Sequence, residues 1–99
     1  MKSVQISVHF EYSDMVERLL ERIGVEAYIR YPMVEGCDID GKHFGTQVHP
    51  GNVTVYHAQV PENLIDRLMN TLQRFRDEKQ GHRHVEALVL PIERRLSDQ

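Results

Sequence analysis

The sequence contains one cysteine, Cys37, so an intramolecular disulfide is excluded. Structural disulfides belong to oxidising compartments, and their absence predicts a reducing, cytoplasmic location. The N-terminus lacks the apolar core of a secretory signal, and no uninterrupted apolar stretch approaches the ~18 residues that a membrane span needs. We therefore expect a cytoplasmic protein without a membrane segment.

An excess of positive charge is also missing. Twelve Lys and Arg residues stand against fifteen Asp and Glu, which gives a net charge of −3. A general nucleic-acid binder needs a basic face to neutralise phosphates, so we expect no nucleic-acid partner. The 99 residues, 40% hydrophobic and 27% charged, predict a single soluble globular domain over residues 1–99.

Hydrophobic periodicity predicts four strands and two helices. Strict alternation over residues 3–10 is typical of a strand with one apolar face, and helical spacing over 13–23 is followed by Gly24, a typical helix end. Further strands are expected over 25–34, 52–60 and 82–92, and a second helix over 61–80. The order predicts an α+β, ferredoxin-like βαββαβ fold, with a four-stranded antiparallel sheet and two helices on one face.

The last expected strand is apolar on both faces. Val85, Ala87 and Val89 alternate with a second apolar set, Leu88, Leu90 and Ile92. A monomer with one solvated sheet face has no need of this pattern. It favours an oligomer in which sheets pack together.

Periodicity disappears between residues 35 and 51. This segment holds Gly36, Gly41, Gly45 and Gly51, and a loop of this length inside a small domain is usually functional or disordered. We refer to it as the 35–51 loop.

Three features resemble the PII-like superfamily of small trimeric signalling proteins. Val34-Glu35-Gly36 leads into the 35–51 loop at the position of that family's T-loop, and the ending ALVLPIE over 87–93 is similar to its C-terminal FVLPVE strand. The element order agrees over residues 1 to about 95. Residues 43–51, HFGTQVHPG, are similar to the H-x-G-x-x-V-W-P-G loop of a divergent group of GlnB-related PII-like proteins, with His49 in place of the tryptophan.

The resemblance implies a non-enzymatic homotrimer that takes a small-molecule or metal effector in clefts between subunits. It also implies a protein partner that docks on the loop, and a membrane transporter is one class of such partner. The expected loop residues for ligand and partner are Gly36, Cys37, Asp38, Lys42, His43, Gly45, His49 and Gly51.

The turn before the last strand departs from the family pattern. Nitrogen-sensing members have a glycine-rich T-G-x-x-G-D-G-K turn whose backbone approaches ATP. Residues 77–84 of this chain contain a single glycine, Gly81. This argues against ATP binding in the usual PII mode. His82 and His84 would share one face of an extended strand beside Lys79 and Arg83, as a chelating or phosphate-contacting pair at a cleft. An ordinary polar turn is the alternative that we favour.

Six histidines raise a second hypothesis, a trimeric protein for metal sensing or tolerance. Thiolate and imidazole ligands suit zinc, copper or nickel, and the loop offers Cys37, Asp38, His43 and His49. Their spacing matches no standard zinc signature, so a polar surface loop is the simpler interpretation. His9 and His57 are expected at a subunit interface, either as hydrogen-bonded residues or as a symmetric three-histidine metal site.

An enzyme is not expected. Catalytic cysteines need a neighbouring base and an electropositive setting, whereas Cys37 lies among Glu35, Asp38 and Asp40. The sequence contains no P-loop, dinucleotide fingerprint or Ser-His-Asp pattern.

Overall fold

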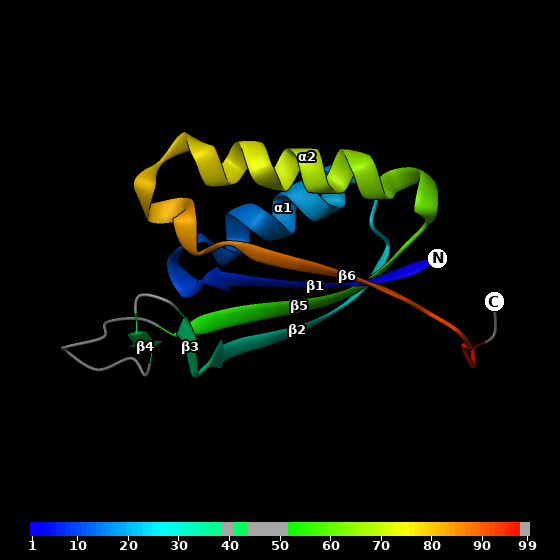
Figure 1. Cartoon of the computed structure of the whole chain (residues 1–99), viewed down its shortest axis with the longest axis horizontal. Helices are drawn as coiled ribbons and strands as arrows, with labels where there is room; N and C mark the ends of the chain where they lie inside the picture. The colour runs from blue at the N-terminus through cyan, green and yellow to red at the C-terminus, as the bar shows by residue number, and fades with distance from the viewer. Residues whose placement is uncertain (39–40, 44–51, 98–99) are drawn as a thin grey trace.

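A computed structural model describes residues 1–38, 41–43 and 52–97 (Figure 1). The main strands are β1 (Lys2–His9), β2 (Ala27–Val34), β5 (Val53–Val60) and β6 (Glu86–Pro91), and the helices are α1 (Ser13–Ile23) and α2 (Glu62–Glu78). A short hairpin, β3 (Gly36–Asp38) and β4 (Gly41–His43), follows β2. The 3₁₀ turns η1 (Phe10–Tyr12) and η2 (Gln80–His84) precede α1 and β6.

The four main strands form an antiparallel sheet in the order β2-β5-β1-β6, with both helices against one face (Figure 1). This confirms the ferredoxin-like fold predicted from the sequence. Alternate strand residues and the apolar stripes of the helices form the core: Val4, Ile6, Val8, Val16, Leu20, Tyr56, Ala58, Val60, Leu68, Leu72 and Phe75. Full burial of each Val, Leu, Ile or Phe side chain contributes about 1.5–3 kcal/mol.

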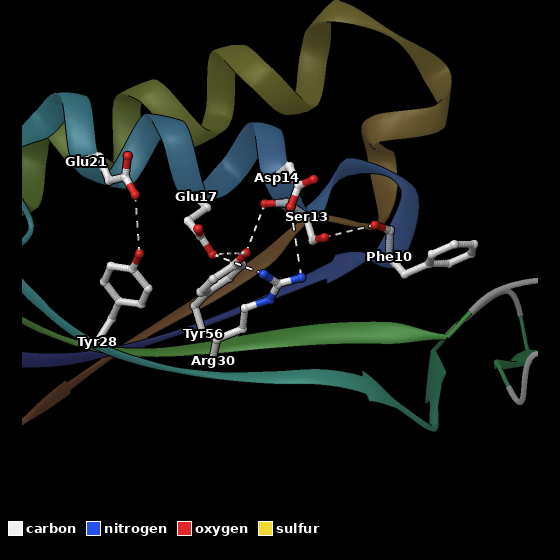
Figure 2. A network of polar contacts seen from close by, with 8 residues as sticks. All are labelled: Phe10, Ser13, Asp14, Glu17, Glu21, Tyr28, Arg30 and Tyr56. Atoms are coloured by element: carbon white, nitrogen blue, oxygen red, sulfur yellow. Dashed lines mark hydrogen bonds and ion pairs between the residues drawn. The ribbon is translucent and has the colours of Figure 1, made fainter.

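A polar network centred on Tyr56 joins the sheet to α1 (Figure 2). The fully buried Tyr56 hydroxyl lies 3.0 Å from the Ser13 carbonyl oxygen and 3.1 Å from Glu17 Oε1, and donates its one proton between them. Arg30 Nη1 lies 3.5 Å from the same Glu17 oxygen. Burial, and then the hydrogen bond to Glu17, raise the pKa of Tyr56. The hydroxyl therefore stays protonated, and its hydrogen bonds hold α1 against β5.

The turn between α2 and β6 corrects one prediction. Residues 80–84 form a 3₁₀ turn and β6 begins at Glu86, so the expected strand over 82–92 is wrong in its first residues. His82 is 1% exposed and stacks on Phe75, with ring centroids 3.9 Å apart, while Tyr12 meets its edge. His82 Nδ1 also lies 2.7 Å from the Phe75 carbonyl oxygen. His82 is therefore a core residue and shares no strand face with His84.

Tyr12 also explains the one glycine of this turn. A Cβ atom at Gly81 would collide with the Tyr12 hydroxyl and would lie 3.2 Å from Cζ of the same ring. Gly81 thus has a packing role on the protein's own aromatic ring.

Replacing Tyr56 with Phe should lower the free energy of unfolding by about 1–3 kcal/mol at neutral pH, because a buried bond to a carboxylate is lost. A raised folded-state pKa contributes stability below the ordinary tyrosine pKa, about 10, and loses it as pH rises above that value. The difference between wild type and variant should therefore shrink above pH 10 in urea unfolding. A difference that grows above pH 10 would contradict this role.

Replacing Gly81 with Ala should destabilise the protein by about 1–3 kcal/mol through overpacking against Tyr12. Adding Tyr12→Phe removes the hydroxyl and should restore part of the loss in the double variant. Gly36→Ala is the control, because its Cβ would meet Val53 at an ordinary 3.7 Å. Equal losses for Gly81→Ala with and without Tyr12→Phe, in thermal melts, would refute the packing role.

Candidate ligand cavity and assembly face

A cavity of about 230 Å³ lies where the 35–51 loop leaves and rejoins the sheet. The register pairs Ser7 with Val55 and with Glu86, and His9 with Val53. Because Val4, Ile6 and Val8 face the helices, these alternate residues lie on the opposite face of the sheet. We call that helix-free face the open face, and this pocket the root cavity.

The lining of the root cavity combines aliphatic and polar residues. Val34, Val53 and Val55 supply aliphatic surface. The polar groups are the hydroxyl of Ser7, the thiol of Cys37, the imidazoles of His9 and His84, and the carboxylates of Glu35 and Glu86. A mostly apolar concave surface with a few convergent polar groups is typical of a site for a small organic ligand.

The contacts of His9 come from the turn that follows β1. The backbone N–H of Glu11 donates to His9 Nδ1 at 3.4 Å, and the Glu11 carboxylate lies 3.9 Å from the same nitrogen. The Phe10 and Tyr12 rings lie 5.0 and 6.2 Å from the imidazole, centroid to centroid. The His9 ring is thus held at the strand end that faces the cavity.

Four of the residues expected from the sequence line this cavity: His9, Gly36, Cys37 and His84. Lys79 and Arg83 are exposed and lie outside its lining, and His82 is buried in the core. Gly45, His49 and Gly51 lie outside the described residues. The backbones of Asp38, Lys42 and His43 belong to the β3–β4 hairpin.

The predicted metal site is only partly within the described chain. Among the described residues, no group of three or more His, Cys, Asp or Glu side chains could hold a metal ion. The hairpin register pairs Cys37 with Lys42 and His43 with Gly36, so Cys37 and His43 are not cross-strand partners. The fourth candidate, His49, lies outside the described residues, and the metal site remains a prediction.

Ser7, Glu35, Glu86 and the two β5 valines were not predicted as site residues. The only sequence signal for Ser7 is its place on the polar side of the first alternating segment. Glu86 comes beside Ser7 through pairing of β6 with β1, which are far apart in sequence.

The open face also carries exposed apolar side chains. Ile29 and Leu88 are 58% and 59% exposed, and Tyr31 and Leu90 are also exposed. His57 lies on the same face, where its Nε2 is 3.3 Å from Ser3 Oγ. Ile29 and Tyr31 lie on edge strand β2, and Leu88 and Leu90 on the opposite edge strand β6, so the open face carries an exposed apolar strip along each edge. Exposed apolar strips of this kind mark surfaces for association.

The sequence matches no protein-family model and no curated protein. Solved structures do match. CPII from Thiomonas intermedia K12, a nitrogen regulatory PII-like protein bound to ADP, AMP and bicarbonate, has 23% identity and a TM-score of 0.73, over 89% of this chain and 81% of that chain. Its apo form has 22% identity and a TM-score of 0.68, over 89% and 84%.

A candidate PII-like signalling protein from Thermus thermophilus has 17% identity and a TM-score of 0.66, over 89% of this chain and 82% of that chain. TM-scores of 0.66 to 0.73 over 89% of this chain show a common fold, and the resemblance predicted from the sequence is confirmed in that respect. The chain has the fold of the nitrogen regulatory PII-like proteins.

Proposed function

We propose that this chain is a non-enzymatic regulatory protein of the PII-like type. It binds a small effector in the root cavity, and the effector sets the conformation of the 35–51 loop, which docks on a partner protein. The observation that carries the proposal is the position of the cavity, whose lining includes Glu35, Gly36 and Cys37 from the first residues of the loop.

The mechanism is selection among loop conformations. A glycine-containing loop has many backbone states, and a ligand that contacts its first residues stabilises those compatible with binding. Ordering of a segment by a ligand is a common switching device, because the partner then meets one surface instead of many. A membrane transporter is one class of partner that the resemblance implies for such a loop.

We further propose that three copies assemble through the open face. The four exposed apolar side chains on that face would be buried between sheets, which explains why β6 is apolar on both faces. Each root cavity opens on the same face, so the neighbouring copy completes it as a cleft between subunits.

The chemistry of the cavity guides the choice of effector. Its volume and mixed lining suit a compact polar molecule, and the CPII structures hold ADP, AMP and bicarbonate. ATP held by a glycine-rich turn is disfavoured, because Gly81 is packed against Tyr12. A divalent transition metal bound by loop residues is the alternative effector.

We propose a cytoplasmic location, which suits a chain with one cysteine. Within the described residues, no helix has the length and apolar character needed to cross a membrane.

Leu88→Lys should dissociate the assembly, because it places a charge in the exposed apolar strip of β6 on the open face. Size-exclusion chromatography with light scattering should change from a trimer mass to the 11.6 kDa chain. Leu96→Lys is the matched control, since Leu96 is fully exposed beyond β6 and its substitution should leave the mass unchanged. A Leu88→Lys protein that keeps the trimer mass would refute assembly through this face.

Deletion of residues 37–49 should abolish partner binding and leave the trimer assembled.

Filling the root cavity should abolish effector binding. Ser7→Leu extends an aliphatic side chain into it, whereas Ser3→Leu makes the same change on the same strand and face at the remote end. Thermal melts with ADP, AMP, bicarbonate and zinc should show a ligand-dependent rise in Tm for wild type and Ser3→Leu only, since a ligand that binds the folded state stabilises it. An unchanged rise in Ser7→Leu would place the ligand elsewhere. A rise with zinc alone that survives Ser7→Leu would favour the metal hypothesis.

A further inference from the structure

A bulge interrupts β2 just before the 35–51 loop. Tyr31 pairs with Val55, but the next pair is Val34 with Val53, so Thr54 stands opposite two residues, Pro32 and Met33. Met33 has φ 54°, and among the described residues it alone combines a side chain with a positive φ. A left-handed conformation is unfavourable for a residue with a Cβ and persists only where neighbouring groups hold it.

Asn52 supplies the group that holds Met33. Its side-chain Nδ2 donates to the Met33 carbonyl oxygen at 3.1 Å. The Asn52 backbone carbonyl in turn accepts from the Phe10 N–H at 2.9 Å. Asn52 stands immediately before β5, so one residue ties the end of β2 to the end of β1 at the point where the loop rejoins the sheet.

The bulge has a consequence for the root cavity. Residues 34–37 follow Met33 directly and line the cavity together with Ser7 and His9 of β1, two strands away from β2 in the sheet. A straight β2 would continue along its own direction beyond the end of the sheet. A bulge bends its strand and increases the local twist. The left-handed Met33 therefore accounts for the turn of residues 34–37 toward β1.

We propose that Asn52 is a positioning residue of the root cavity: its bond to the Met33 carbonyl holds the bulge in the left-handed conformation and so fixes the cavity wall formed by residues 34–37. The importance of Asn52 for effector binding rests on the proposed function. The role of Asn52 in holding the bulge does not depend on that function, and it can be tested without any ligand.

A double-mutant cycle isolates this role. Met33→Gly removes the side chain and also the steric cost that a Cβ atom adds at positive φ. Met33→Ala removes the side chain beyond Cβ but keeps that cost, so it is the matched control. Asn52→Ala removes the donor, and Asn52→Asp replaces it with an acceptor of the same shape. Met33→Gly should melt about 4 °C above Met33→Ala. Asn52→Ala and Asn52→Asp should each lower Tm, and by more in the Met33→Gly background than in wild type or Met33→Ala, because relaxation of the bulge relieves strain only where residue 33 carries a Cβ.

Cys37 gives a readout that a purely structural role would not move. It is the only cysteine of the chain and lines the cavity from the wall in question. Its rate of reaction with a disulfide reagent such as DTNB, measured at a temperature where every variant is folded, reports the placement of that wall. Asn52→Ala should change the rate about fivefold, as expected when loss of one restraining contact alters the surroundings of the exposed thiol, and Met33→Gly should reduce that change.

The outcomes separate cleanly. Losses in Tm and changes in thiol rate that depend on the residue at position 33 support the proposal. Equal effects of Asn52→Ala in the Met33→Ala and Met33→Gly backgrounds, or an unchanged Cys37 rate, would overturn it. Because neither measurement uses an effector, failure here leaves the proposed function standing, and failure of effector binding leaves the Asn52 inference standing.

Discussion

The main constraint on this molecule is that two helices can cover only one face of a four-stranded sheet. Buried residues of β1 and β5 face α1 and α2, and the Tyr56 hydroxyl fixes α1 against β5 through Ser13 and Glu17. The open face is left with apolar side chains from both edge strands, β2 and β6. The proposed assembly and the root cavity both follow from this asymmetry, because both lie on the face that the helices leave uncovered.

The fold was predictable because its pattern is local. Alternation over residues 3–10 separates Val4, Ile6 and Val8 from the polar side of the same strand, and the structure buries those three valine and isoleucine side chains under the helices. The failure at His82 has the opposite cause. Apolar residues from 85 onward extend a strand pattern backwards, but contacts with Tyr12 and Phe75 stabilise a buried 3₁₀ turn instead, and Tyr12 is distant in sequence.

The candidate site was predictable only where the loop itself enters it. Gly36 and Cys37 belong to the segment that lacks periodicity, and that feature is visible in the sequence. Glu86 joins Ser7 through strand pairing, which no local pattern specifies. The left-handed Met33 is harder still to foresee, because methionine gives no signal for a positive φ and the conformation depends on Asn52, which lies nineteen residues later.

The charges of the root cavity connect ligand binding with assembly. Among the described lining residues the acidic side chains are those of Glu35 and Glu86, and no lysine or arginine is present. An anionic effector in this cavity alone would meet repulsion from these two carboxylates. The compensating positive charge must therefore come from outside this lining, and a neighbouring copy in the proposed assembly is one source of it. An anion would then bind tightly only in the proposed assembly, which is the coupling that a regulatory protein requires.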